Sequence, residues 1–158
     1  MLTLLHRAAA IWTALGLASG LYYRELTKAN GVSGGTQLAV AHTHALSLGT
    51  LTLLILLALA AALDINHRHF RWGVITWQVG LGITFGAMLV KGSLQVLDRS
   101  GADSAALAGI AGTGHILLTA AFIFLFLGLG AAVSVRQRPA LDPSAQCLGT
   151  TRQTSESA

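Results

Sequence analysis

One apolar run, residues 37–63, limits the folds open to this chain more than any other feature, because it contains no charged residue. A helix needs about 20 apolar residues to cross ~30 Å of hydrocarbon. Comparable runs occupy residues 4–23, 72–95 and 105–135. Since lipid cannot hydrogen-bond a peptide group, a spanning segment must satisfy its own backbone, as a helix does. We therefore predict an all-α integral membrane protein, folded as an antiparallel four-helix bundle.

Composition supports the same class of protein. Hydrophobic residues make up 53% of the chain and charged residues only 10%, with a mean hydropathy of +0.64, which is too apolar for a soluble domain of this size. The net charge of +4 suits contact with the lipid bilayer rather than with nucleic acid. The single Cys147 excludes an intramolecular disulfide.

The chain divides into a four-span domain, residues 1–135, and a polar tail, residues 136–158. The tail is rich in Ser, Thr and Gln, holds both prolines and lacks apolar periodicity, so we predict that it is disordered. The first run also resembles a cleaved signal peptide, because small residues occur near Gly20. A long apolar run and a small-residue stripe at helical spacing favour a retained span.

Small residues recur at helical spacing in all four spans, which indicates helices that approach one another closely in lipid. The stripes are Ala9, Thr13, Gly16 and Gly20; Ala41, Ala45, Gly49 and Thr52; Gly80, Thr84, Ala87 and Lys91; and Ala108, Gly112, His115 and Thr119.

Three histidines lie inside the spans, where ionisable groups are costly and mark candidate functional sites. His42 and His44 are two residues apart, so they project about 200° from each other and cannot readily chelate one ion together. His115 comes from the last span and falls in the same half of the membrane. A shared site therefore has to combine His115 with one of the other two.

Two neutral imidazoles from facing helices, among small residues, suit the two axial positions of a haem iron. His42 lies nearer the small stripe of its span, so we favour His42 and His115 as ligands of haem b, with His44 as a hydrogen-bond partner or alternative ligand. A Cu or Zn site formed by the same residues, or a structural network with no cofactor, remains the alternative.

Three cations are expected at the same membrane face as these histidines. Arg24, Lys28 and Lys91 would there pair with haem propionates, or else contact lipid headgroups. The remaining histidines, His6, His67 and His69, occupy span ends or a polar loop and are expected to be solvated or interfacial.

Three motifs carry a resemblance: Tyr23-Arg24-Glu25-Leu26-Thr27-Lys28, His42-Thr43-His44 followed by Gly49, and Gly114-His115-Ile116. Together they resemble a domain-of-unknown-function family of small bacterial four-span membrane proteins, which implies the fold but no activity. The histidine motif is also distantly similar to the haem-ligand spans of haem-copper oxidase catalytic subunits. This chain has far fewer spans and no recognisable copper-ligand set, so the similarity implies haem binding without oxygen reduction.

No nucleophile beside a base, phosphate-binding loop or pair of intramembrane carboxylates occurs in the sequence, which argues against an enzyme. We predict a haem-binding protein for electron transfer or for redox or gas sensing, in the cell membrane, with a membrane redox partner or a second copy of itself as a possible partner. The alternative is a structural or assembly subunit. Basic residues near the span ends are slightly more numerous if both termini are cytoplasmic, which sets the expected orientation.

Overall fold

The structure, a computed structural model, describes residues 1–65 and 67–137, and these residues form four long helical rods. The predicted disordered tail falls, beyond Gln137, outside the described residues. The elements are α1 (Leu2–Ala29), α2 (Gln37–His44), the π-helix η1 (Ala45–Leu51), α3 (Thr52–Leu63), α4 (Arg68–Val96) and α5 (Ala105–Arg136).

The elements α2, η1 and α3 run on without a break, and we refer to Gln37–Leu63 as the second span. With α1, α4 and α5 it makes four helices that are long and apolar enough to cross a membrane. The predicted all-α fold with four spans is confirmed. The helices exceed the predicted apolar runs: α1 continues to Ala29 and α4 starts at Arg68. Long polar side chains can extend from such helix ends into the headgroup layer.

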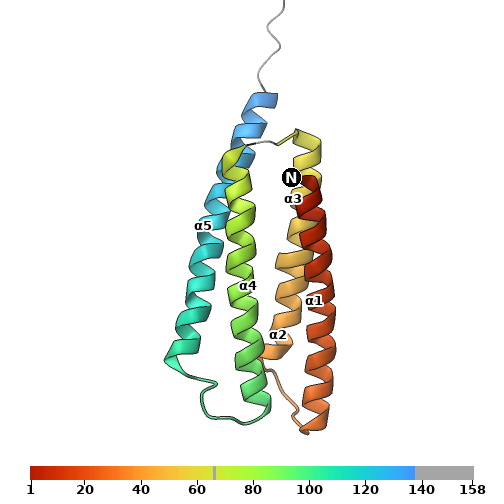
Figure 1. Ribbon diagram of the computed structural model, residues 1–158, viewed down its shortest axis with the longest axis vertical. Helices are drawn as coiled ribbons and strands as arrows, with labels where there is room; N and C mark the ends of the chain where they lie inside the picture. Colours follow the sequence, from red (N-terminus) through yellow and green to blue (C-terminus); the bar gives the residue numbers. More distant parts are fainter. Residues whose placement is uncertain (66, 138–158) are drawn as a thin grey trace, which may run out of the picture.

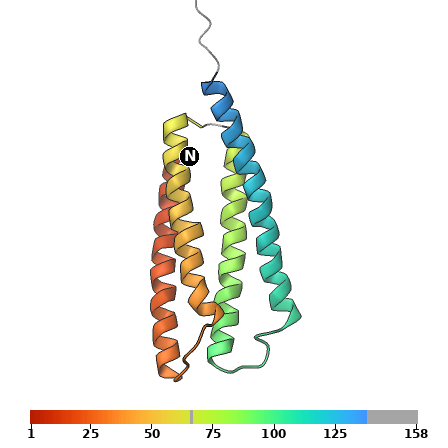
Figure 2. The same ribbon diagram turned by 180° about the vertical axis from the view of Figure 1, so that it is seen from behind.

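The helices alternate in direction and form two hairpins, α1 with the second span and α4 with α5 (Figures 1 and 2). The loops of residues 30–36 and 97–104 lie at one end, and we call this the loop end. Residue 1 and the turn from α3 to α4 lie at the other end, the turn end. Helix α4 contacts all the other spans, whereas α5 packs almost entirely on α4. The bundle is therefore organised around α4.

Glycines set the closest approach between α4 and α5. A Cβ atom added to Gly128 would lie 2.8 Å from the backbone nitrogen of Phe70, and one added to Gly73 would lie 2.9 Å from that of Leu125. Real Cβ atoms do not come so close to a backbone, so only glycine allows this spacing. In lipid, where the hydrophobic effect does not hold helices together, such close packing supplies the attraction.

The small-residue stripe predicted for the last span is wrong. Ala108, Gly112, His115 and Thr119 are all exposed on α5. The buried stripe is instead formed by Gly114, Leu118, Ala121, Leu125, Gly128 and Ala132. Small residues occur on both faces of α5. The buried face is the one whose glycines leave room for Thr84 and Phe70 of α4. The stripes predicted for the other spans are buried or half-buried, as expected.

The π-helical segment η1 was not anticipated from the sequence. Its wide turns suit the spacing of the buried residues Ala41, Ala45, Gly49 and Leu53, which recur every four residues instead of every ~3.6. Gly49 lies directly against the ring of Trp12 on α1. The Nε1–H group of Trp77 on α4 donates to the Leu48 carbonyl at 2.9 Å, which joins η1 to α4.

We expect Gly114→Ala to destabilise the bundle and Gly112→Ala to leave it unchanged or slightly stabilised. A methyl group at Gly114 would meet the backbone nitrogen of Thr84 at 2.9 Å, whereas nothing lies within 4 Å of one at Gly112. Overpacking of this kind costs about 1–3 kcal/mol. Thermal unfolding of the two variants in the same detergent compares them directly, and equal midpoints would contradict the packing described for α5.

Candidate functional site

The second span and α5 each pack on α4, and we call the strip of the bundle over α4 between them the groove. Near the loop end it contains a cavity of about 200 Å³ whose lining residues come from all three helices: Gln37, Ala87, Met88, Lys91, Leu107, Ala108 and Ala111. The side-chain oxygen of Gln95 on α4 accepts from the Gln37 backbone N–H at 2.8 Å and so holds the start of the second span. At the turn end, Arg136 of α5 donates to the carbonyl of Ala62. The groove is thus bounded along its length by these two contacts.

His44 and His115 lie on the two walls of this groove. The second span and α5 run in the same direction, because each begins after a loop at the loop end. Gln37 and Ala108 line the same cavity, and His44 and His115 follow them by seven residues each. Seven residues of α-helix advance about 10 Å and complete nearly two full turns. Helix geometry therefore places each histidine two turns beyond the cavity, on the same face of its helix as the cavity-lining residue.

Hydrogen bonds determine the tautomers of these two histidines. The Nδ1 atom of His44 is 3.2 Å from the Val40 carbonyl oxygen, and that of His115 is 2.9 Å from the Ala111 carbonyl oxygen. A carbonyl only accepts, so each Nδ1 carries the hydrogen and, in the neutral ring, each Nε2 keeps its lone pair. This backbone bond is the one that commonly orients a metal-binding histidine. His44 is half-buried and His115 is exposed, so both Nε2 atoms are available to a ligand in the groove.

His42 is oriented differently. Its ring packs against Gly20 of α1, where an added Cβ would be 3.7 Å from the His42 Cβ and Cγ atoms. Its Nδ1 atom is buried and has no hydrogen-bond partner in the described part of the chain. The separation of about 200° between His42 and His44 thus directs one toward α1 and the other toward the groove. Helix geometry places His44, and not His42, on the side of the second span that carries Gln37, but α2 does not contact α5, so neither histidine is in contact with His115.

Aromatic side chains line the groove beyond the histidines. The rings of Trp77 and Phe122 meet edge to face, with centroids 4.8 Å apart. Because Trp77 also donates to the Leu48 carbonyl, it connects α5 to the second span across α4. One consequence is that the wide turn following His44 is held by a residue of another helix. The position of Trp77 inside the apolar run of residues 72–95 was a sequence signal for its burial.

Two polar contacts away from the groove were not predicted from the sequence. Gln78 accepts from Trp12 Nε1 at 2.6 Å, and Thr13 and Thr50 hydroxyl groups are 3.0 Å apart. Amides and hydroxyls that bond across helices stabilise a bundle in lipid by roughly 0.6 kcal/mol each on average. A lone glutamine in an apolar span was the available signal. These contacts join α1 to α4 and to the second span.

Of the three cations predicted near the site, Lys91 is beside the groove. Its Nζ atom is 3.2 Å from an Asp103 carboxylate oxygen. Arg24 lies 3.8 Å from Glu25, with both side chains exposed, and Lys28 is in the last turn of α1. Helix α1 does not contact α5. Arg24 and Lys28 therefore share the loop end with Lys91 but lie on the other side of the second span.

The outer histidines lie apart from this site. His6 and His69 are exposed, and His67 is half-buried in the turn between α3 and α4. Within residues 1–65 and 67–137, no group of three or more His, Cys, Asp or Glu side chains is placed to hold a metal ion. The donors that the groove offers are the two imidazoles.

Comparison with known proteins identifies one family model. It is described as "Protein of unknown function (DUF2871)" and matches residues 2–132, nearly all of the four-span domain. No curated protein and no solved structure matches the chain.

We expect ¹⁵N NMR of histidine-labelled protein in detergent micelles to show the neutral rings of His44 and His115 as Nδ1–H tautomers. The backbone carbonyls of Val40 and Ala111 accept from these nitrogens and stabilise that form. Exposed His6 serves as the reference, and His44→Ala and His115→Ala assign the signals. An Nε2–H tautomer at either groove histidine would contradict the geometry.

Proposed function

This chain belongs to the DUF2871 family of unknown function, and we propose that it binds haem b between His44 and His115 for electron transfer or for redox or gas sensing. The observation that supports the proposal is that both Nδ1 atoms are engaged by backbone carbonyls, which leaves each Nε2 lone pair to a ligand, on two helices that line the same cavity. His44 replaces His42 as the favoured partner of His115, because His42 packs against α1.

The donor set favours haem over a bare ion. Haem supplies four equatorial nitrogens itself and takes one or two axial ligands, which two imidazoles provide. Zinc sites use three or four protein ligands, and imidazole alone does not distinguish Cu from Zn. A Cu or Zn site that recruits further ligands is the alternative, and a structural role without a cofactor is the second. Bound haem would supply a one-electron redox couple or a gas-binding iron, depending on whether both histidines stay attached.

The walls of the groove also suit a large flat apolar group. Phe122 presents aromatic surface on the turn-end side of the histidines, where the buried Trp77 supports its ring, and Met88 lies toward the loop end. The cavity of about 200 Å³ occupies only the loop-end part of the groove, and the rest opens toward lipid beside the exposed His115. Lys91 lines that cavity, where its ammonium could exchange Asp103 for a propionate.

We propose that both termini are cytoplasmic. Arginines near the predicted inner ends are Arg7, Arg68, Arg71, Arg136 and Arg138, against Arg24, Lys28, Lys91 and Arg99 at the opposite ends. The positive-inside rule then favours this orientation by one charge. It puts the groove cavity and the two histidines in the outer half of the membrane.

We expect membranes that contain the protein, with adequate haem supply, to show a sharp Soret band that shifts on dithionite reduction and a low-spin six-coordinate spectrum. His44→Ala and His115→Ala should each give a high-spin or haem-free protein, because either change opens an axial position. His42→Ala and the exposed control His6→Ala should keep the low-spin spectrum.

Other outcomes separate the alternatives. A colourless protein whose purified form does not take up added haem would contradict the proposal. About one equivalent of Zn or Cu per chain, lost in His44→Ala and His115→Ala, would instead favour the bare-metal site. Absence of any metal, together with lower thermal stability of those variants, would favour the structural role, since an unpaired buried polar group costs about 1–3 kcal/mol.

The orientation has its own test. A reporter fused after Arg138 should be active in the cytoplasm, and one inserted at Gly34 should be active on the outer side. Gly34 suits insertion because it lies in an exposed loop with open space around it. The reverse activities would place the histidines in the inner half of the membrane.

A further inference from the structure

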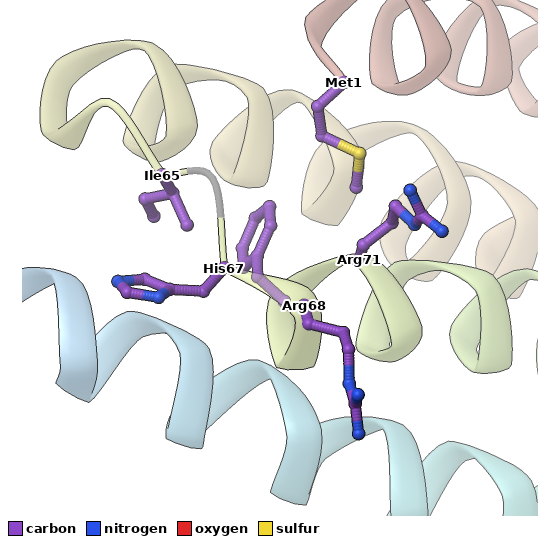
Figure 3. Close-up of a pocket in the computed structure, with 6 residues that line it drawn as sticks. Met1, Ile65, His67, Arg68 and Arg71 are labelled. Carbon is purple, nitrogen blue, oxygen red and sulfur yellow. The ribbon is translucent and has the colours of Figure 1, made fainter.

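A second cavity lies at the turn end, away from the groove histidines. Its volume is about 380 Å³, and Figure 3 shows the residues that line it: Met1, Ile65, His67, Arg68, Phe70 and Arg71. Phe70 is buried and supports the cavity from below, whereas both arginines are exposed. The cavity thus combines a fixed apolar floor with cationic groups that are free to move.

The positive charge around this cavity is not neutralised by nearby side chains. In the part of the chain that the structure describes, neither Arg68 nor Arg71 makes an ion pair, since the pairs formed involve Arg24 and Lys91. Asp64 borders an adjacent cavity rather than this one. In Figure 3, Arg71 extends on the side of Met1, Arg68 extends toward α5, and His67, on the turn before α4, points away from both. The cationic groups surround the cavity instead of meeting at one point.

The depth of the cavity matches the phosphate layer of a bilayer. Helix α4 has 29 residues, which at ~1.5 Å per residue exceeds the ~30 Å hydrocarbon core and approaches the full thickness with headgroups. Arg68 and Arg71 belong to its first turn, so they lie in the headgroup layer. The exposed Trp72 follows them and is typical of the same layer.

We propose that this cavity binds the phosphate of an anionic phospholipid. A guanidinium group can donate two parallel hydrogen bonds to the oxygens of one phosphate. Basic pockets between transmembrane helices are suited to acidic headgroups. The N-cap residue His67 makes no side-chain hydrogen bond to the first turn of α4, so backbone N–H groups there remain available to an anion as well. Two arginines that extend in different directions, with the polar His67 beside them, fit a headgroup that carries an esterified phosphate and polar glycerol better than a single small ion. The inference is independent of the proposed haem site.

Native mass spectrometry of the detergent-solubilised full chain, with added phosphatidylglycerol or phosphatidylcholine, tests this site. We expect the wild type to retain phosphatidylglycerol in preference. Arg68→Gln and Arg71→Gln should each lower the apparent affinity for it about fivefold, which corresponds to about 1 kcal/mol per basic residue near a membrane surface. Arg68→Lys should retain part of the affinity, because it keeps the charge but loses the paired donors.

Arg99→Gln is the matched control, because it removes the same charge from an exposed position at the loop end. An equal loss in Arg99→Gln, or an unchanged preference in the double variant Arg68→Gln/Arg71→Gln, would overturn the proposal. Displacement of the lipid by millimolar inorganic phosphate would assign the cavity to the free anion and also overturn it. Circular dichroism of each variant verifies that the helices are intact.

Discussion

Close contact between α4 and α5 at glycine is the interaction on which the rest of the structure depends. Lipid is as apolar as the side chains it surrounds, so helices associate only where they pack tightly or hydrogen-bond. Gly114 and Gly128 allow α5 to approach Thr84 and Phe70 of α4 closely enough for that packing. Because this face of α5 is committed to α4, its other faces are exposed. One of them forms a wall of the groove that carries His115.

Polar groups inside the bundle follow a second rule: nearly all of them form a hydrogen bond to a group of a helix. Trp77 donates to the Leu48 carbonyl of η1, Trp12 donates to Gln78, and threonines donate to carbonyls of their own helix. These bonds lower the cost of keeping polar atoms away from water. The groove histidines obey the rule at Nδ1 only. Their Nε2 lone pairs stay free for a ligand, whereas the buried exceptions to the rule in the described residues are Thr36 Oγ1, His42 Nδ1 and Gln78 Nε2.

The two ends of the bundle differ in chemistry. The groove near the loop end is largely apolar, with Lys91 at its edge and aromatic rings further along. The cavity at the turn end is basic, with Arg68 and Arg71 in its lining. Helix α4 takes part in both, since it supplies the groove floor and the arginines of the basic cavity. A lipid bound at Arg68 and Arg71 would therefore contact the same helix that positions the groove.

The sequence by itself determined the fold class and the number of spans. Four apolar runs of spanning length can only be helices in lipid, because each backbone N–H and C=O must be satisfied within its own segment. It also determined that His42 and His44 point in nearly opposite directions, since that follows from helix periodicity alone. The small stripe of α4 was also predicted, from the helical spacing of Gly80, Thr84 and Ala87, and these residues are buried.

Only the tertiary structure decided which faces meet. Helix α5 carries small residues on two faces, at Gly112 and at Gly114, and periodicity cannot choose between them because the choice depends on the partner surface. The same applies to the histidine pair: His42 or His44 faces α5 according to the side on which α1 packs. The π-helix at Ala45–Leu51 likewise follows from the contact of Gly49 with Trp12 and of Leu48 with Trp77. These contacts join residues that are distant in sequence, so a local sequence pattern cannot predict them.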